Sequence, residues 1–318
     1  MASNKSAAAV VSQNAAKRFN AESIIKTPRK RRSSQMAAKR FTRSKAGNFF
    51  YFLFIIAAAA FSVLPLVYCV ATSFKPLDEL LIFPPRFFVT RPTIANYTAL
   101  PDLLSNLRVP LSRYVFNSLF ITFFTTFLYI IIAAMAAFVL SKSNIKGKNV
   151  IFYIVQFSLL FSTYTLAVPQ YLIFTWLNII DTYWVCILPQ FASTMGVFLM
   201  KQYIEGAIPK ALLEAAKIDG AGNFRIFWQI AMPIIKPAWL TLLLFAFRDV
   251  WSAGSPSTIF SESLKTLPTI MGQITAGGVA RSGSAMAVTC ILMIPPIIVY
   301  MISQSNVMEA MSSAGIKE

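Results

Sequence analysis

The residues of this chain that could act on a polar molecule are amide, hydroxyl and indole side chains set inside long apolar runs. We nominate six of them as candidates for a substrate path: Asn117, Gln156, Tyr164, Gln170, Gln190 and Trp251. Such groups, turned toward a protein interior, suit the binding of a polar solute such as a sugar. Each could instead make a hydrogen bond between helices or anchor a helix at an interface. Both interpretations stay open.

Catalytic chemistry has little support in the sequence. The chain has no histidine, which is the usual metal ligand and general base. Cys69, Cys186 and Cys290 stand singly inside apolar runs, so their spacing predicts packing residues rather than a disulfide framework or a metal site. No G-x-x-x-x-G-K-[ST] loop is present to hold nucleotide phosphates. We therefore expect no enzyme activity, no cofactor and no ATP hydrolysis by the chain itself.

The composition indicates an integral membrane protein. Of 318 residues, 56% are hydrophobic and 13% are charged, and the mean hydropathy is +0.62. Six apolar runs approach the length of about 20 residues that a spanning helix needs. They lie at residues 49–74, 114–140, 149–176, 183–204, 233–252 and 284–304. The fourth and fifth runs are the weakest, because polar residues and prolines interrupt them. We predict an all-α protein with six transmembrane helices.

The N-terminal tail is strongly basic. Residues 1–45 hold twelve Lys and Arg residues and one acid, Glu22, within a chain of net charge +17. The stretch "TPRKRRSS" could be a nucleic-acid-binding arm, but ahead of a spanning helix it more simply fixes orientation and contacts anionic membrane lipid. We predict that residues 1–48 form a disordered cytoplasmic tail, that residues 49–318 form the membrane domain, and that no nucleic acid is bound.

The charges of the loops predict the orientation of the membrane domain. With the basic tail inside the cell, two further basic loops are also inside, and their residues are Lys142, Lys146 and Lys148, then Lys201, Lys210, Lys217, Arg225 and Lys236. Both termini are then cytoplasmic. The segments 75–113, 177–182 and 253–283 face the outside.

Residues 205–233 predict a helix, a turn and a second helix on the cytoplasmic side. Pro209 suits the first turn of a helix, and Gly220 suits the left-handed residue just beyond its end. Asn223 is the expected cap of the second helix, and Pro233 is expected to open the fifth span. Three groups of residues give this unit its faces: the stripe Ala211, Leu212, Ala215 and Ala216, the possible ion pairs among Lys210, Glu214 and Lys217, and the aromatic face Phe224, Phe227 and Trp228.

Those faces favour docking on another chain. Small alanines permit close backbone approach, and the aromatic face can hold the unit against the ends of the membrane helices. The alternative is an amphipathic helix lying on the lipid surface, which would need a large apolar face ringed by lysines. Alanines and acids fit that alternative poorly.

The loop also resembles a known family. "EAAKIDG", nine further residues and "IAMP" are similar to the loop of permease subunits of binding-protein-dependent ABC importers. The whole stretch "IPKALLEAAKIDGAGNFRIFWQIAMPIIKPA" resembles the carbohydrate group, which includes the second maltose-permease subunit and multiple-sugar permeases. The resemblance covers residues 48–318, including a C-terminal "SSAGIKE" that in such subunits reaches toward the ATPase. It implies a type I importer permease fold in a bacterial plasma membrane.

The resemblance also implies partners and site residues. The partners would be a second homologous permease subunit, an ATP-binding cassette ATPase dimer, an extracellular solute-binding protein and a sugar substrate. Six residues match the motif that forms a cytoplasmic coupling helix docking on the ATPase: Glu214, Ala215, Ala216, Gly220, Ile230 and Pro233. ATP-driven closure of the ATPase would move this helix and swing the spans packed on it.

Two alternatives stay open. One is an ABC permease for a solute other than a sugar, which has the same loop but usually lacks "IDGA". The other is a secondary transporter or intramembrane enzyme, which would need acids or a catalytic constellation within the spans. Only Asp181 and Asp249 come near such positions.

Overall fold

The computed structural model describes residues 45–105, 108–161 and 163–315, and every regular element in these ranges is a helix. The chain divides into two units, one ending at Val63 and one beginning at Leu64, which are described separately. Residues 1–44 of the predicted tail lie outside the described ranges, as do the last three residues of the C-terminal "SSAGIKE". Residues 45–48, predicted to belong to the tail, instead begin the first helix.

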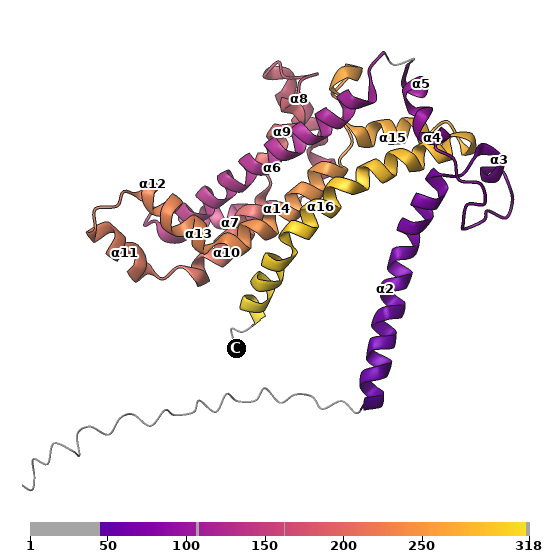
Figure 1. Ribbon diagram of the computed structural model, residues 1–318. Helices are drawn as coiled ribbons and strands as arrows, with labels where there is room; N and C mark the ends of the chain where they lie inside the picture. Colours follow the sequence, from indigo (N-terminus) through magenta and orange to yellow (C-terminus); the bar gives the residue numbers. More distant parts are fainter. Residues whose placement is uncertain (1–44, 106–107, 162, 316–318) are drawn as a thin grey trace, which may run out of the picture. The chain divides into compact units, whose positions relative to one another are not determined.

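The described part of the first unit is the start of helix α2, Lys45–Ser73 (Figure 1). Its sequence lacks acids and is rich in aromatic and aliphatic residues. The side chains of Phe50, Phe54 and Phe61 are 66%, 72% and 75% exposed within the chain. Such exposure is costly in water and costs little in lipid or against another apolar helix. We therefore interpret α2 as a membrane-spanning helix.

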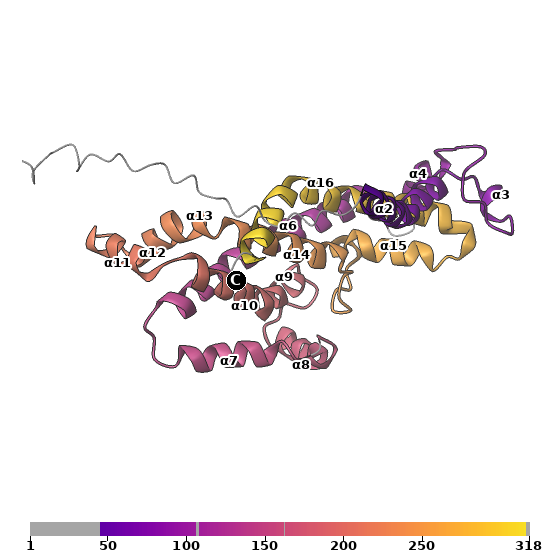
Figure 2. The ribbon, with the colours of Figure 1, turned by 90° about the horizontal axis from the view of Figure 1, so that it is seen from below.

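In the second unit four long helices lie side by side: α6 (Leu111–Lys142), α10 (Thr194–Ala207), α14 (Lys236–Ser252) and α16 (Ser282–Gly315) (Figures 1 and 2). Helix α6 is central, because it packs on both α10 and α14. Its Ala134 and Ala137 are fully buried and let neighbouring backbones approach closely. On α10, the N–H of Gly196 donates to the hydroxyl of Tyr129 on α6 at 2.8 Å.

One end of this unit holds a second core. There α5 (Leu100–Ser105) and α15 (Leu267–Thr275) pack with the beginnings of α6 and α16. Two shorter helices, α3 (Leu77–Leu80) and α4 (Ala95–Thr98), precede α5. The buried Glu79 carboxylate accepts hydrogen bonds from the backbone N–H groups of Thr90 and Arg91 at 3.1 and 2.9 Å. These bonds satisfy a buried charge and fix the segment that follows α3.

Four segments of the described residues are long and apolar enough to cross a membrane: Gly47–Ser73, Leu111–Lys142, Trp184–Ala207 and Val279–Gln304. The third of these combines α9 (Trp184–Phe191) with α10. A fifth span exists if Asn223–Ile234 and α14, which meet at a bend of 79°, count as one. The described residues thus contain four or five candidate spans where the sequence predicts six.

The predicted span at 149–176 is not one continuous helix. It consists of α7 (Lys148–Ser158) and α8 (Thr163–Trp176), with a turn after Ser158. The Ser158 hydroxyl donates to the carbonyl of Ile154 at 2.8 Å, a back-bond that often bends helices. Helix α7 is held to α10 by stacking of Phe152 on Phe198, with ring centroids 6.1 Å apart.

The fifth predicted span, residues 233–252, is bent near its start. Pro233 does not begin its long helix but lies within the short helix α13, Met232–Ile234. The bend falls at Ile235, and α14 begins at Lys236 with Pro237 in its first turn. A proline in the first turn lacks only a donor that would have no partner there. Pro237, rather than Pro233, is therefore the proline that begins the long helix α14.

Candidate functional site

The helix predicted between Pro209 and Gly220 exists as α11, Lys210–Ile218, and its end is built as expected. Gly220 has φ of +80°, in the left-handed region. Its N–H donates to the carbonyl of Lys217, and the N–H of Ala221 donates to the carbonyl of Ala216, both at 3.0 Å. These two bonds form a Schellman motif, which satisfies carbonyls left free at a helix end. Pro209 lies one residue before the helix, in the cap position.

The second helix begins differently from the prediction. Gly222, with φ of −69° and ψ of 159°, occupies the cap position of α12, Asn223–Ile226. Asn223 is already helical and makes no cap bond, so the predicted cap is wrong by one residue. The extended backbone of Gly222 lets the chain enter the helix earlier. A π-helical turn, Phe227–Ala231, continues α12 into α13.

One side of this unit is part of the core that holds α6 and α10 together. Leu213, Ala216, Ile226 and Phe227 are buried with residues of both long helices. The ring of Phe227 lies edge-on to Phe138 of α6, with centroids 5.7 Å apart. Leu213 and Ala216 are thus the residues through which α11 joins the core of α6 and α10.

Two parts of the predicted aromatic face are not buried. Phe224 is 68% exposed and Trp228 is 38% exposed, so only Phe227 holds the unit as expected. Ile226, 1% exposed, was missed by the sequence reasoning. Nothing in the sequence indicated that Ile226 is buried. Which residues of α12 face the core depends on where the helix begins, and that start was predicted one residue too late.

The outer side of α11 carries an exposed stripe, which we define as Ala211, Leu212, Ala215 and Ile218. These positions are spaced i, i+1, i+4 and i+7 and share one helical face. The predicted stripe contained Ala216, which is wrong, since Ala216 is 8% exposed and faces the core. Ile218, at 87% exposed, takes its place. An apolar face of this kind, left uncovered, is typical of a docking surface.

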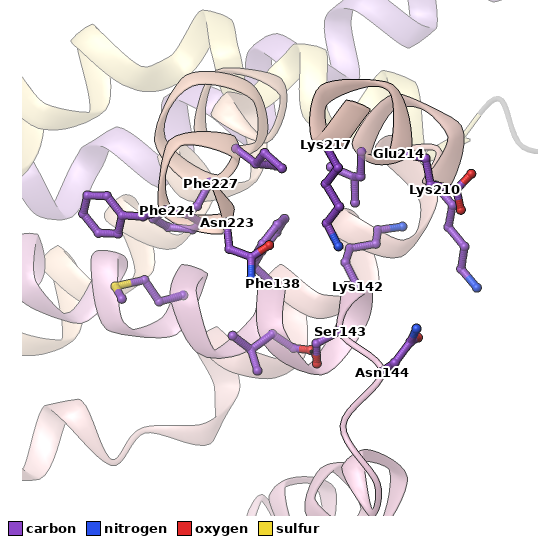
Figure 3. Close-up of a pocket in the computed structure, with 14 residues that line it drawn as sticks. Phe138, Lys142, Ser143, Asn144, Lys210, Glu214, Lys217, Asn223, Phe224 and Phe227 are labelled. Carbon is purple, nitrogen blue, oxygen red and sulfur yellow. Dashed lines mark hydrogen bonds between the residues drawn. The ribbon is translucent and has the colours of Figure 1, made fainter. Parts of the chain in front are cut away.

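A third side of α11 faces a pocket of about 650 Å³ between α11, α12 and the end of α6 (Figure 3). Lys210, Leu213, Glu214 and Lys217 line it from α11. The predicted ion pairs of Glu214 with Lys210 and Lys217 do not form among the residues that the structure describes. Glu214 belongs to this pocket face rather than to the exposed stripe.

The last two motif residues lie beyond α12. Ile230 is half-buried against the core shared with α6 and α10. Pro233 is exposed on α13, two residues before the bend. Together with Gly220, these residues shape the loop that carries α11, while Ala215 alone of the six matched residues belongs to the exposed stripe.

Asn117 and Trp251 both have structural partners. The buried amide of Asn117 donates to the carbonyls of Ser263 and Lys265 at 2.8 and 2.9 Å and accepts from the Tyr183 hydroxyl at 2.8 Å. The indole N–H of Trp251 donates to the carbonyl of Leu292 at 2.9 Å. These are the bonds between elements that the sequence left open as the alternative to solute binding.

The other four candidates of the substrate path are dispersed. Gln156, Gln170 and Gln190 are half-buried on α7, α8 and α9. The side chain of Tyr164 lies outside the described residues. No hydrogen bond in the described part of the chain joins any two of the six candidates.

Asp181 ties the segment after α8 to the segment that precedes α15, which the sequence did not predict. Its carboxylate accepts from the backbone N–H groups of Phe260 and Ser261 at 2.9 and 2.8 Å, and from the Ser261 hydroxyl. The bond from the Ser261 hydroxyl contributes most to holding the pKa of the Asp181 carboxyl below its usual range, and the two backbone bonds add to it. This role is structural, and it accounts for one of the two acids near the spans.

Comparisons with known proteins agree on one family. Residues 34–312 match the model of the binding-protein-dependent transport system inner membrane component. Protein LplC of Bacillus subtilis is 29% identical, over 86% of this chain and 97% of LplC. The polygalacturonan/rhamnogalacturonan transport system permease protein YtcP of the same organism is 27% identical, over 80% of this chain and 92% of YtcP.

A solved structure is also similar. It belongs to a bacterial ABC transporter involved in the import of the acidic polysaccharide alginate. The alignment has a TM-score of 0.67 and 24% sequence identity, and it covers 83% of this chain and 98% of the other. The likeness shows the fold of the described helices.

Proposed function

The chain belongs to the family of binding-protein-dependent transport system inner membrane components, and from this premise we propose that it is the transmembrane permease subunit of an ABC importer for a sugar or oligosaccharide. The observation that carries the proposal is α11, a capped helix that is buried on one side in the core of the long helices and exposes a separate apolar stripe. A spanning pathway needs no such helix. A permease driven by a separate ATPase does.

The proposed coupling follows from the contacts of α11. The exposed stripe docks on an ATPase subunit, and Gly220 sets the turn that orients it. When ATP closes the ATPase dimer, α11 moves, and Leu213, Ala216 and Phe227 transmit the movement to α6 and α10. Glu214, Ala215, Ala216, Gly220, Ile230 and Pro233 remain the proposed coupling residues, with Ala216 acting through the core.

The proposed topology has six spans, with α7 and α8 together forming the third and the bent pair before Ser252 the fifth. Both termini are cytoplasmic, the basic extension ends where α2 begins at Lys45, and the rest of the chain forms the permease domain in a bacterial plasma membrane. The loop with Lys146 lies on the same side as α11, which agrees with an excess of basic residues on cytoplasmic loops.

The sugar assignment is supported by YtcP, whose name gives polygalacturonan and rhamnogalacturonan as its substrates, and by the resemblance of the "IDGA" loop. The proposed partners are a second permease subunit, two ATPase subunits and an extracellular binding protein. Gln156, Gln170, Gln190 and Tyr164 are the proposed contacts of the sugar path. Asn117 and Trp251 would support the path through the bonds they already make.

Affinity purification of the tagged chain from gently solubilised membranes tests the proposal. We expect mass spectrometry to find a second permease subunit and an ATPase in stoichiometric amounts. Leu212→Glu places a charge on the exposed stripe and should release the ATPase while keeping the second permease. Lys146→Gln, an exposed change on the neighbouring loop, should release neither. Isolation of the wild-type chain alone, or only with itself, would contradict the proposal.

The substrate class needs its own measurement. The co-purifying binding protein, isolated with its ligand, should release a sugar or oligosaccharide on denaturation, detectable by mass spectrometry. A peptide or an inorganic anion in its place would keep the importer assignment and overturn the carbohydrate one.

A further inference from the structure

The side chains that line the pocket between α11, α12 and the end of α6 have no role in the proposed docking of the exposed stripe (Figure 3). Its polar side holds three lysines, Lys142, Lys210 and Lys217, against one acid, Glu214. None of these four residues is in an ion pair in the described part of the chain. The pocket therefore carries an excess of positive charge.

The lysines keep free donors. Lys142 uses one of its three N–H groups on the carbonyl of Ile208, at 2.6 Å. In Figure 3 the side chains of Lys142 and Lys217 both extend into the space between α11 and the end of α6. Two neutral donors, the amides of Asn144 and Asn223, line the same space. Such a set of donors suits a phosphate group.

The other side of the pocket is apolar and open. Met135 and Val139, one turn apart on α6, are 41% and 42% exposed, and Phe224 across from them is 68% exposed. Phe138 and Phe227 form the floor. The two α6 residues belong to the last turns of a helix long and apolar enough to cross a membrane. The apolar wall is thus continuous with the surface that this helix offers to lipid or to a neighbouring spanning helix.

We propose that this pocket binds an anionic phospholipid. The phosphate lies between Lys142 and Lys217, with Lys210 nearby, and an acyl chain lies along Met135, Val139 and Phe224. Basic pockets at the cytoplasmic ends of spanning helices attract anionic headgroups, and lysine stems bury their methylenes while the amino group reaches the interface. The bound lipid would bridge α6 and α11, and so tune the stiffness of the coupling unit. Lipid binding itself does not rest on the proposed transport function.

Native mass spectrometry of the purified chain with its co-purifying subunits, exchanged into phosphatidylglycerol or phosphatidylcholine, tests this inference. We expect one phosphatidylglycerol retained beyond the phosphatidylcholine level. Lys142→Gln with Lys217→Gln should weaken that binding about 25-fold, or about fivefold for each lysine. Lys146→Gln, on the same loop but outside the pocket, should not change it. The double variant Lys142→Arg with Lys217→Arg keeps both charges and should retain the lipid. That result would show that substitution at these two positions does not by itself disrupt the pocket.

Two further arms separate a lipid from a free anion. Phe224→Ala should weaken phosphatidylglycerol binding, and inorganic phosphate at millimolar concentration should not displace the lipid. Displacement by phosphate together with no effect of Phe224→Ala would assign the pocket to a free anion and overturn the lipid proposal. Equal retention of the two lipids, or equal retention by the glutamine and arginine double variants, would also overturn it.

Discussion

Gly220 is the residue on which the end of α11 depends. Its φ of +80° is strained for a residue with a Cβ, while an added Cβ would meet no atom within 4 Å. The cost of Gly220→Val is therefore backbone strain of about 1–2 kcal/mol, which would favour a different loop conformation. We expect association with the ATPase to weaken roughly 5- to 30-fold, as measured by titration of the solubilised permease with the purified ATPase.

Two substitutions control for that effect. Gly220→Asn should behave nearly like wild type, because asparagine adopts the left-handed conformation more readily than other residues with a side chain. Gly222→Ala should also be tolerated, because Gly222 has φ of −69° and open space at its Cβ. Loss of ATPase binding in Gly222→Ala, with normal binding in Gly220→Val, would show that the Schellman end is not what positions α11.

The carboxylate of Asp181 gives a prediction about pH. Because its pKa is lowered in the folded chain by the Ser261 hydroxyl and neighbouring N–H groups, its contribution to stability is present above the unfolded pKa of about 3.9. That contribution is lost as the pH falls through the lower folded value. Asp181→Asn, which also suits the φ of 58° there, should lower stability at pH 7 by about 1 kcal/mol.

Thermal unfolding of the solubilised protein at several pH values measures this contribution. The difference in unfolding temperature between wild type and Asp181→Asn should shrink as the pH is lowered below about 4. A difference that stayed constant down to the lowest pH at which the protein remains folded would mean that the charge of Asp181 does not hold the segment after α8 to the segment that precedes α15.

At the scale of elements, the contact between α6 and α10 rests on Gly196. A Cβ at this position would lie 2.3 Å from the hydroxyl oxygen and 2.7 Å from Cζ of Tyr129, which is closer than real contacts allow. Gly196→Ala should therefore push the helices apart or force Tyr129 to move, with a loss of about 1–3 kcal/mol. Thermal unfolding in detergent measures the loss.

Gly272→Ala is the matched control for that substitution. Gly272 lies inside α15, and its added Cβ would meet nothing within 4 Å. Alanine favours helix there, so this variant should be as stable as wild type or slightly more stable. Equal losses in the two variants would point to a general effect of the added methyl rather than to the contact of α10 with α6.

The elements that could be predicted from the sequence are those with their own local signals. Helix α11 ends where Gly220 requires, and the long apolar helices lie near their predicted ranges. The register of α12 could not be predicted, because it depends on the core that buries Ile226 and leaves Phe224 outside. Which proline begins the long helix α14 was likewise not predicted, since Pro233 and Pro237 both suit a helix start.

At the scale of the whole molecule, contacts between segments far apart in the chain could not be predicted from the sequence. The thiols of Cys69 and Cys290 lie 3.8 Å apart although 221 residues separate them. Asp181 reaches Ser261 across 80 residues. No spacing rule links such positions, because they meet only after the helices pack. For the same reason, the six polar candidates for a substrate path could be chosen by residue type, but the sequence could not show whether they lie close together in space.

The topology is a prediction at this scale. In a variant without native cysteines, Lys146→Cys should react with a membrane-impermeant maleimide only after the cells are opened. Phe83→Cys, at a side chain that is 92% exposed in the segment after α2, should react in intact cells. Lys146 lies on a basic loop, which we expect to stay in the cytoplasm, whereas Phe83 lies on the other side of one span. Labelling of both positions from the same side would contradict an odd number of spans between them.

The central claim is that the exposed stripe of α11 contacts an ATPase. A photo-cross-linking amino acid at Ile218, which is 87% exposed, tests this contact directly in living cells. We predict that illumination joins the chain to an ATP-hydrolysing subunit, identified by mass spectrometry, and that the same group at Lys146 gives little of this product. Cross-links from Ile218 only to lipid, or to no protein, would contradict the account.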